Sequence, residues 1–249
     1  MSRARSLANI MDASGLIRVE KLENLPITST TQQIFDTAGT FTWTKPAGCK
    51  KVKVTVIGGG GGGGGADGTD TTGTRAGGAG GGGGTSIKTI DVTSITSETV
   101  TVGAGGAGTT VANTYADTGG TSSFGSHCSA TGGLGGRGNY PDAANGYGVS
   151  RGGGLGSGGD LNIAGGTGFM PQSYGEISTS IYYFGTIGGS SYLNNTQFSP
   201  VLSSGAYSSS TQDGFYGSGG SGGLTEDTTS NSSGGSGGDG IVIVEEFYV

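Results

Sequence analysis

The residues that could perform catalysis are few and scattered. His127 is the only histidine in the chain, and no GxSxG elbow accompanies it. The sequence places it in a strand beside Cys128, with no set of partners around it. Cleavage of a glycosidic bond needs two carboxylates that face each other, and the sequence brings no such pair together among Asp160, Glu176, Asp213, Glu226, Asp227 and Asp239. We therefore expect no enzymatic activity.

Cofactor and metal motifs are equally weak. Cys49 and Cys128 lack the CxxC spacing of zinc and redox sites, which predicts two reduced thiols. Eight consecutive glycines at 58–65 satisfy GxGxxG, but no helix follows that could present its N-terminus to a phosphate. Two acidic glycine segments, at 156–163 and 234–242, are not in tandem as calcium-binding repeats would be. The expectation is a protein without a cofactor or a metal.

Aromatic residues offer a different chemistry, which is recognition. Residues 167–216 place tyrosines and phenylalanines among Ser, Asn, Thr and Gly, a composition typical of antibody paratopes. The alternative is that these aromatic side chains cover the ends of a glycine core and bury themselves. Shorter interruptions at 139–150 and 224–233 are candidates for the same end of the molecule. The candidate binding residues are Tyr140, Tyr147, Tyr174, Tyr182, Tyr183, Phe184, Tyr192, Phe198, Tyr207, Phe215 and Tyr216.

The elements that must position these residues are rich in glycine. The chain has 59 glycines in 249 residues but only 5 prolines and no sustained Gly-X-Y period, which excludes collagen. Glycine tracts recur between candidate strands, whereas a flexible linker would occur once or twice. We expect the tracts to pack together as extended helices of three residues per turn, with a core made of backbone.

Short alternating apolar runs predict an all-β frame. They lie at 40–44, 51–57, 85–92, 99–103, 121–133 and 240–249, and five to seven strands in a sandwich-like arrangement are expected. Residues 34–249 would form this glycine-rich domain. Residues 1–33 would form an attachment segment, with Leu7, Ile10 and Met11 at helical spacing and a short strand at 16–22.

Charge narrows the possible partners. The net charge is −6, and all 12 basic residues lie at or before Arg151. Nucleic acid, whose phosphates require clustered Lys and Arg, is therefore not an expected partner. No apolar stretch resembles a signal peptide, so synthesis in the cytoplasm is expected.

Several sequence blocks resemble the glycine-rich domain of bacteriophage tail-fibre and tail proteins, related to the distal adhesins of T-even-type phages. The resemblance covers most of residues 34–249, in the order FTWTKPAGCKKVKVTVIGGGGGGGG, GGGGGTSIKTIDV, TVTVGAGGAG, GGTSSFGSHCSATGG, GSGGDLNI and GGDGIVIVEEFYV. Cys49 replaces the valine of the usual PAGV.

This resemblance implies a virion location and variable loops that bind a receptor on the host cell, either a bacterial surface polysaccharide or an outer-membrane protein. Residues 1–33 would then dock on other tail or fibre proteins, and three-fold fibres imply a homotrimer. Two alternatives remain: a purely structural virion protein, such as a head-decoration fibre or tail connector, and a polysaccharide-degrading tailspike.

Overall fold

The computed structural model describes residues 29–67, 74–140, 147–170, 172–177, 180–184, 186–194, 211–226 and 231–248. These residues form strands and extended tracts without a helix, which confirms the predicted all-β class. The described part accordingly holds no helix long and apolar enough to cross a membrane. The predicted helical positions Leu7, Ile10 and Met11 and the predicted strand at 16–22 lie outside the described residues.

One five-stranded antiparallel sheet runs in the order β1-β14-β3-β5-β10. Its strands are β1 (Ser29–Phe35), β14 (Ile241–Tyr248), β3 (Cys49–Ile57), β5 (Thr85–Asp91) and β10 (Leu161–Ile163). The first and last strands of the described residues, β1 and β14, are paired along their length, from Ser29 opposite Tyr248 to Phe35 opposite Val242. Residues 29–33, assigned by sequence to the attachment segment, thus form part of the sheet.

The second five-stranded sheet runs in the order β2-β6-β7-β8-β9. It contains β2 (Gly39–Thr44), β6 (Ser97–Val102), β7 (Ser122–Phe124), β8 (Cys128–Ala130) and β9 (Gly156–Ser157). The expectation that His127 lies in a strand is wrong. Gly125 takes a left-handed φ of 50° and the His127 N–H donates to the Phe124 carbonyl at 3.1 Å, so the run at 121–133 folds as a hairpin with His127 in its turn.

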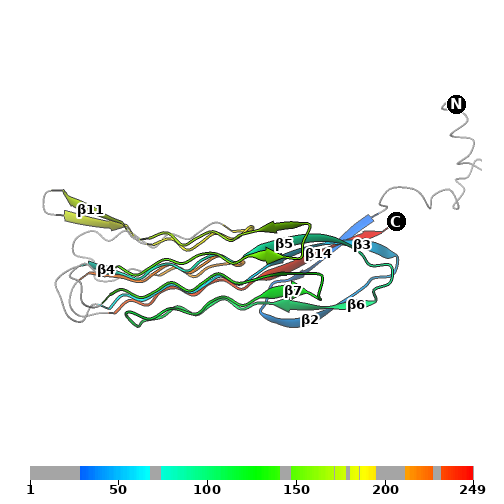
Figure 1. Cartoon of the computed structure of the whole chain (residues 1–249), viewed down its shortest axis with the longest axis horizontal. Helices are drawn as coiled ribbons and strands as arrows, with labels where there is room; N and C mark the ends of the chain where they lie inside the picture. Colours follow the sequence, from blue (N-terminus) through cyan, green and yellow to red (C-terminus); the bar gives the residue numbers. More distant parts are fainter. Residues whose placement is uncertain are drawn as a thin grey trace, which may run out of the picture.

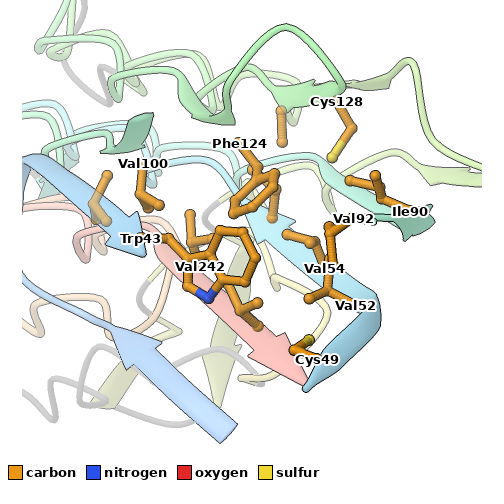
Figure 2. Close-up of a cluster of buried hydrophobic side chains, with 14 residues drawn as sticks. Trp43, Cys49, Val52, Val54, Ile90, Val92, Val100, Phe124, Cys128 and Val242 are labelled. Carbon is orange, nitrogen blue, oxygen red and sulfur yellow. The ribbon is translucent and has the colours of Figure 1, made fainter. Parts of the chain in front are cut away.

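The two sheets enclose a small hydrophobic core, shown in Figure 2. Strict alternation in β3 sends Val52, Val54 and Val56 inward, where all three are fully buried. Val242 and Val244 of β14 do the same from the neighbouring strand. Trp43 and Phe124 enter from the second sheet, with ring centroids 5.6 Å apart. The predicted sandwich-like frame therefore has a conventional but small apolar centre.

A buried carboxylate belongs to this frame. Glu246 continues the inward-facing alternation of β14 and is only 2% exposed. Its Oε1 accepts hydrogen bonds from Trp43 Nε1 at 2.8 Å and from Gln33 Nε2 at 2.7 Å, and its Oε2 accepts one from the Thr31 hydroxyl. A buried charge is tolerated only when hydrogen bonds replace its lost hydration. Two strands, β1 and β2, supply these three donors.

Beyond the sheets, glycine tracts run side by side away from the frame. In Figure 1, β2, β6 and β7 lie at one end of the tracts, and β4 (Thr74–Ala76) and β11 (Gln172–Ile177) lie at the other. We call the end that carries β4 and β11 the distal end. The tracts bond to each other through their backbones, as the central tract at 58–65 illustrates.

The hydrogen bonds of this central tract repeat every third residue. Gly58, Gly61 and Gly64 donate to carbonyls at Gly84, Gly81 and Gly78. Gly59 and Gly62 donate to residues 120 and 117, and Gly60 and Gly63 donate to residues 238 and 235. Its carbonyls accept from three further segments, at 106–109, 133–139 and 220–223. Six neighbours and a three-residue period are what laterally packed helices of three residues per turn require.

Close approach explains why these positions must be glycine. A Cβ built on Gly62 would lie 2.1 Å from the Ala107 carbonyl oxygen, and one on Gly63 would lie 1.9 Å from the Ser221 oxygen. Real Cβ atoms essentially never come within 3.0 Å of a heavy atom outside their own and the two adjacent residues. The core of this region is therefore made of backbone whose polar groups are paired with one another.

Candidate recognition surface

The distal end is held together by short bridges between segments that are distant in sequence. β4 pairs with β13 (Leu224–Glu226), and isolated bridges join Ala66 to Ser232 and Ala76 to Tyr147. Phe169 bridges to Ile187 at the base of the hairpin formed by β11 and β12 (Ser180–Phe184). Parts of all three stretches that the sequence singled out, 139–150, 167–216 and 224–233, thus reach this end.

Exposed aromatic side chains gather at the distal end. The predicted Tyr140 is 41% exposed, and the structure adds Tyr115 at 52% and Phe169 at 59%. Tyr147 differs, because it is half-buried against Ala76 and Leu224 and so contributes to packing. Tyr115 was missed in the sequence because it stands alone between glycine tracts, in ANTYADTGG, and not in an aromatic-rich run.

Four predicted residues fall in the distal hairpin. β11 and β12 place Tyr174 opposite Tyr182, Ser173 opposite Tyr183 and Gln172 opposite Phe184. The pairing becomes irregular between Tyr174 and Ile177. Figure 1 shows this hairpin at the extreme of the molecule, away from both five-stranded sheets. Phe198 and Tyr207 lie outside the described residues.

The remaining predicted aromatics lie elsewhere. Tyr192, Phe215 and Tyr216 are each about half exposed, and Ser191 and Asn194 bind the backbone of the last two through the Tyr216 and Phe215 carbonyls. Gly217, the next residue, donates to the Asp239 carbonyl and accepts from the Gly83 N–H, both at 2.7 Å.

Gly83 and Asp239 lie just before β5 and β14, so this second group sits where the tracts meet the frame. We call Tyr192, Phe215 and Tyr216 the junction aromatics. The aromatic residues that appear as one run in the sequence are thus divided between two ends of the tracts.

The carboxylates considered for catalysis are engaged with the backbone wherever their side chains are described. Asp160 accepts from the Thr89 N–H at 2.9 Å, and Asp213 accepts from the Ser236 N–H at 2.7 Å. Asp239 bridges the N–H groups of Gly105 and Ala38 at 2.8 and 3.3 Å. Each carboxylate thereby fixes one segment to another. No group of three or more potential metal ligands occurs among the described residues.

The surroundings of His127 and of the two cysteines do not form a catalytic arrangement among the described residues. His127 Nε2 lies 3.1 Å from Glu98 Oε1. An open cavity of about 150 Å³ beside His127 and Ser157 is small compared with the roughly 300 Å³ of typical ligand pockets. Cys49 and Cys128 are free and buried, and desolvation by burial raises the pKa of both thiols. Figure 2 shows them on opposite sides of the core.

Two arginines stand beside the distal aromatics, and the sequence analysis did not single them out. The guanidinium carbon of Arg137 lies 4.2 Å from the Tyr140 ring centroid and 5.6 Å from that of Tyr115. The guanidinium carbon of Arg151 lies 4.6 Å from the Tyr115 centroid. A guanidinium group this close to an aromatic ring is attracted to the face of the ring, and its N–H groups can also donate hydrogen bonds to a polar ligand. The distal surface therefore combines aromatic contact area with positive charge.

A two-sheet frame that mounts a backbone-packed glycine core defines a class of glycine-rich β domains. The sequence model described as "Glycine-rich domain" matches residues 36–246, which is most of the chain. The protein belongs to this glycine-rich domain family. A search of curated proteins finds no match.

Proposed function

We propose that this protein is a bacteriophage tail-fibre or related virion-appendage protein that presents its distal surface to a receptor on the host cell. The observation that carries the proposal is the spatial separation of two ends. β1, into which residues 1–28 lead, belongs to the frame, whereas the exposed aromatics Tyr115, Tyr140 and Phe169 and the β11–β12 hairpin lie at the distal end. A mount at one end and contact groups at the other suit an adhesin.

The glycine core suits the mechanical part of this role. Its tracts are cross-linked by backbone hydrogen bonds on several sides, so the distal segments are anchored to a stiff base. Rigid aromatic side chains then offer contact area at low entropic cost. Residues 1–28, with Leu7, Ile10 and Met11, would dock on tail or fibre proteins. A homotrimer, and many copies on the virion, would multiply weak contacts with a surface polysaccharide or outer-membrane protein.

Binding of the fluorescently labelled full-length protein to a panel of bacterial strains tests the proposal. We expect binding to a subset of strains, and we expect the distal variant Y140A/F169A to lose at least about tenfold in affinity, as loss of two aromatic contacts predicts. The matched control is Y192A/F215A, which removes two similarly exposed junction aromatics. Failure of the unmodified protein to bind any strain, or equal losses in both variants, would contradict the proposal.

One observation favours a purely structural virion protein as the second candidate. The junction aromatics are exposed on a surface away from the distal end, where a neighbouring subunit could cover them. That function predicts that Y192A/F215A impairs assembly into particles while Y140A/F169A changes nothing. The tailspike alternative predicts release of reducing ends from host polysaccharide, which a reducing-sugar assay would detect.

A further inference from the structure

Four distal side chains form a continuous row of alternating charge and aromatic surface. The order is Arg151, Tyr115, Arg137, Tyr140, with each guanidinium carbon within 5.6 Å of the centroid of the ring next to it. We call these residues the arginine–tyrosine row. The guanidinium carbons of Arg137 and Arg151 lie 5.6 and 4.6 Å from the centroid of the same Tyr115 ring. The two groups are therefore close enough together for one or two sugar units to contact both.

Three neighbouring backbone segments fix this row. Tyr115 and Arg137 form an antiparallel bridge, flanked by hydrogen bonds from the Ala116 N–H to the Gly136 carbonyl and from the Gly138 N–H to the Thr114 carbonyl, both 2.8 Å. The Arg137 N–H donates to the Val149 carbonyl at 2.9 Å, which brings in the segment that carries Arg151. The row is therefore built on the hydrogen-bonded core, and its geometry is set before any ligand arrives.

The positive charge of the row is not neutralised by any described residue. The two ion pairs of the described part, Lys53–Glu245 and His127–Glu98, lie in the frame. Among the described residues Arg137 donates to neutral oxygens, the Tyr140 hydroxyl through Nη1 and Asn113 Oδ1 through Nη2. Since each Nη carries two hydrogens, these two bonds leave one N–H on each Nη unused. Two guanidinium groups that no described residue neutralises, in a chain of net charge −6, favour an anionic partner.

The aromatic members of the row keep enough free surface for contact with a ligand. Tyr115 is 52% exposed and Tyr140 is 41% exposed, although guanidinium groups lie against both rings. The arginines are half-buried, so contact with the rings restricts their rotamers. A guanidinium held in place loses less entropy when it binds a planar anion. The row thus places guanidinium groups with restricted rotamers beside exposed tyrosine rings.

We propose that the arginine–tyrosine row binds an acidic sugar of a cell-surface polysaccharide, with the guanidinium groups on the sugar's anionic substituent and the tyrosines against its ring. The proposal deepens the adhesin function and rests on it. Carboxylate and phosphate share the planar or forked oxygen geometry that arginine recognises, so either substituent could supply the anion. Nucleic acid does not fit, because its continuous phosphate backbone requires many more cations than this isolated pair.

Immobilised polysaccharides test this inference with the full-length protein. The probes are polygalacturonate and alginate, which carry carboxylates, a phosphorylated mannan, and neutral dextran as the uncharged reference. We expect binding to at least one anionic probe, weaker binding at high salt because screening acts on partly exposed charges, and none to dextran. R137Q/R151Q should weaken binding at least about tenfold, because it removes the charge-assisted hydrogen bonds to the anion.

Two controls separate a site from general electrostatics. K50Q/K51Q removes the same charge from two exposed frame residues and should leave binding unchanged. R137K/R151K keeps the charge but loses the fork, and should bind several-fold more weakly than the unmodified protein. The inference is overturned if no anionic probe binds, or if K50Q/K51Q weakens binding as much as R137Q/R151Q does.

Cell binding distinguishes this inference from the function on which it rests. If the unmodified protein and R137Q/R151Q bind responsive bacterial strains equally well, the row is not the receptor site, yet the adhesin function stands. If the unmodified protein binds no strain, the adhesin function itself fails. Thermal melting of each variant, compared with that of the unmodified protein, checks that the fold is intact.

Discussion

A single methyl group added at Gly62 should destabilise the whole glycine core. The new Cβ would lie 2.1 Å from the Ala107 oxygen, whereas ordinary contacts begin near 3.4 Å, so the neighbouring tract must move by more than an ångström. That movement strains two backbone hydrogen bonds, Gly62 N–H to Asp117 O at 2.9 Å and Asp117 N–H to Ala107 O at 3.0 Å. Overpacking costs about 1 to 3 kcal/mol and each strained bond about 1.

We therefore expect G62A to lower the free energy of unfolding by about 3 kcal/mol, a fall of roughly 6 to 12 °C in melting temperature for a chain of this size. Chemical denaturation and thermal melting both measure it. G152A is the matched control, because a Cβ there meets nothing within 4 Å, and it should be neutral or stabilise by up to about 1 kcal/mol.

If G62A does not fold, G120A is a milder substitution whose stability can still be measured. Its Cβ would lie 2.8 Å from the nearest atom, Ala104 N, so the expected loss is smaller than for G62A. The free energy of unfolding should then decrease in the order G152A, G120A, G62A. Equal melting temperatures for G62A and G152A would refute the reasoning that the tracts form a rigid core of backbone.

Two further substitutions or treatments probe the frame. W43F removes the indole donor to the buried Glu246 carboxylate and should lower the free energy of unfolding by about 2 kcal/mol. In an E246Q background the same change should cost less, and strict additivity in this double-mutant cycle would contradict a direct hydrogen bond. Burial raises the pKa of Cys49 and Cys128, so both thiols should react slowly with Ellman's reagent at pH 8 in the folded protein and rapidly after unfolding. Rapid reaction of the folded protein would contradict the burial of these thiols. Because the thiols of the unfolded chain ionise at a lower pH than those of the folded protein, the free energy of unfolding should also fall as the pH rises through about 9.

The frame was predictable because its signals are local. Alternation in β3 fixes which valines face inward, and the same pattern in β14 buries Val242 and Val244. The hairpin of β7 and β8 was not resolved in the sequence, because its turn depends on one glycine in a left-handed conformation within a longer polar run. Local spacing could not reveal that His127 belongs to that turn.

The recognition surface was only partly predictable. Tyr140 and the β11–β12 residues were found from composition, since aromatics among small polar residues stand out against glycine. The same criterion gathered the junction aromatics into the candidate set and passed over Tyr115, Arg137 and Arg151. These three lie on different segments, and their proximity results from hydrogen bonds between tracts.

The sequence by itself determined the all-β class, the alternating strands and the tracts that only glycine can form, because pleat periodicity and the absence of a Cβ are properties of single residues and their neighbours. Tertiary structure alone decided which tracts surround residues 58–65 and which aromatics reach the distal end. Every glycine tract offers nearly identical backbone donors and acceptors, so the sequence of a tract does not specify its partner. The choice depends on how the frame strands are connected and on the length of chain between them.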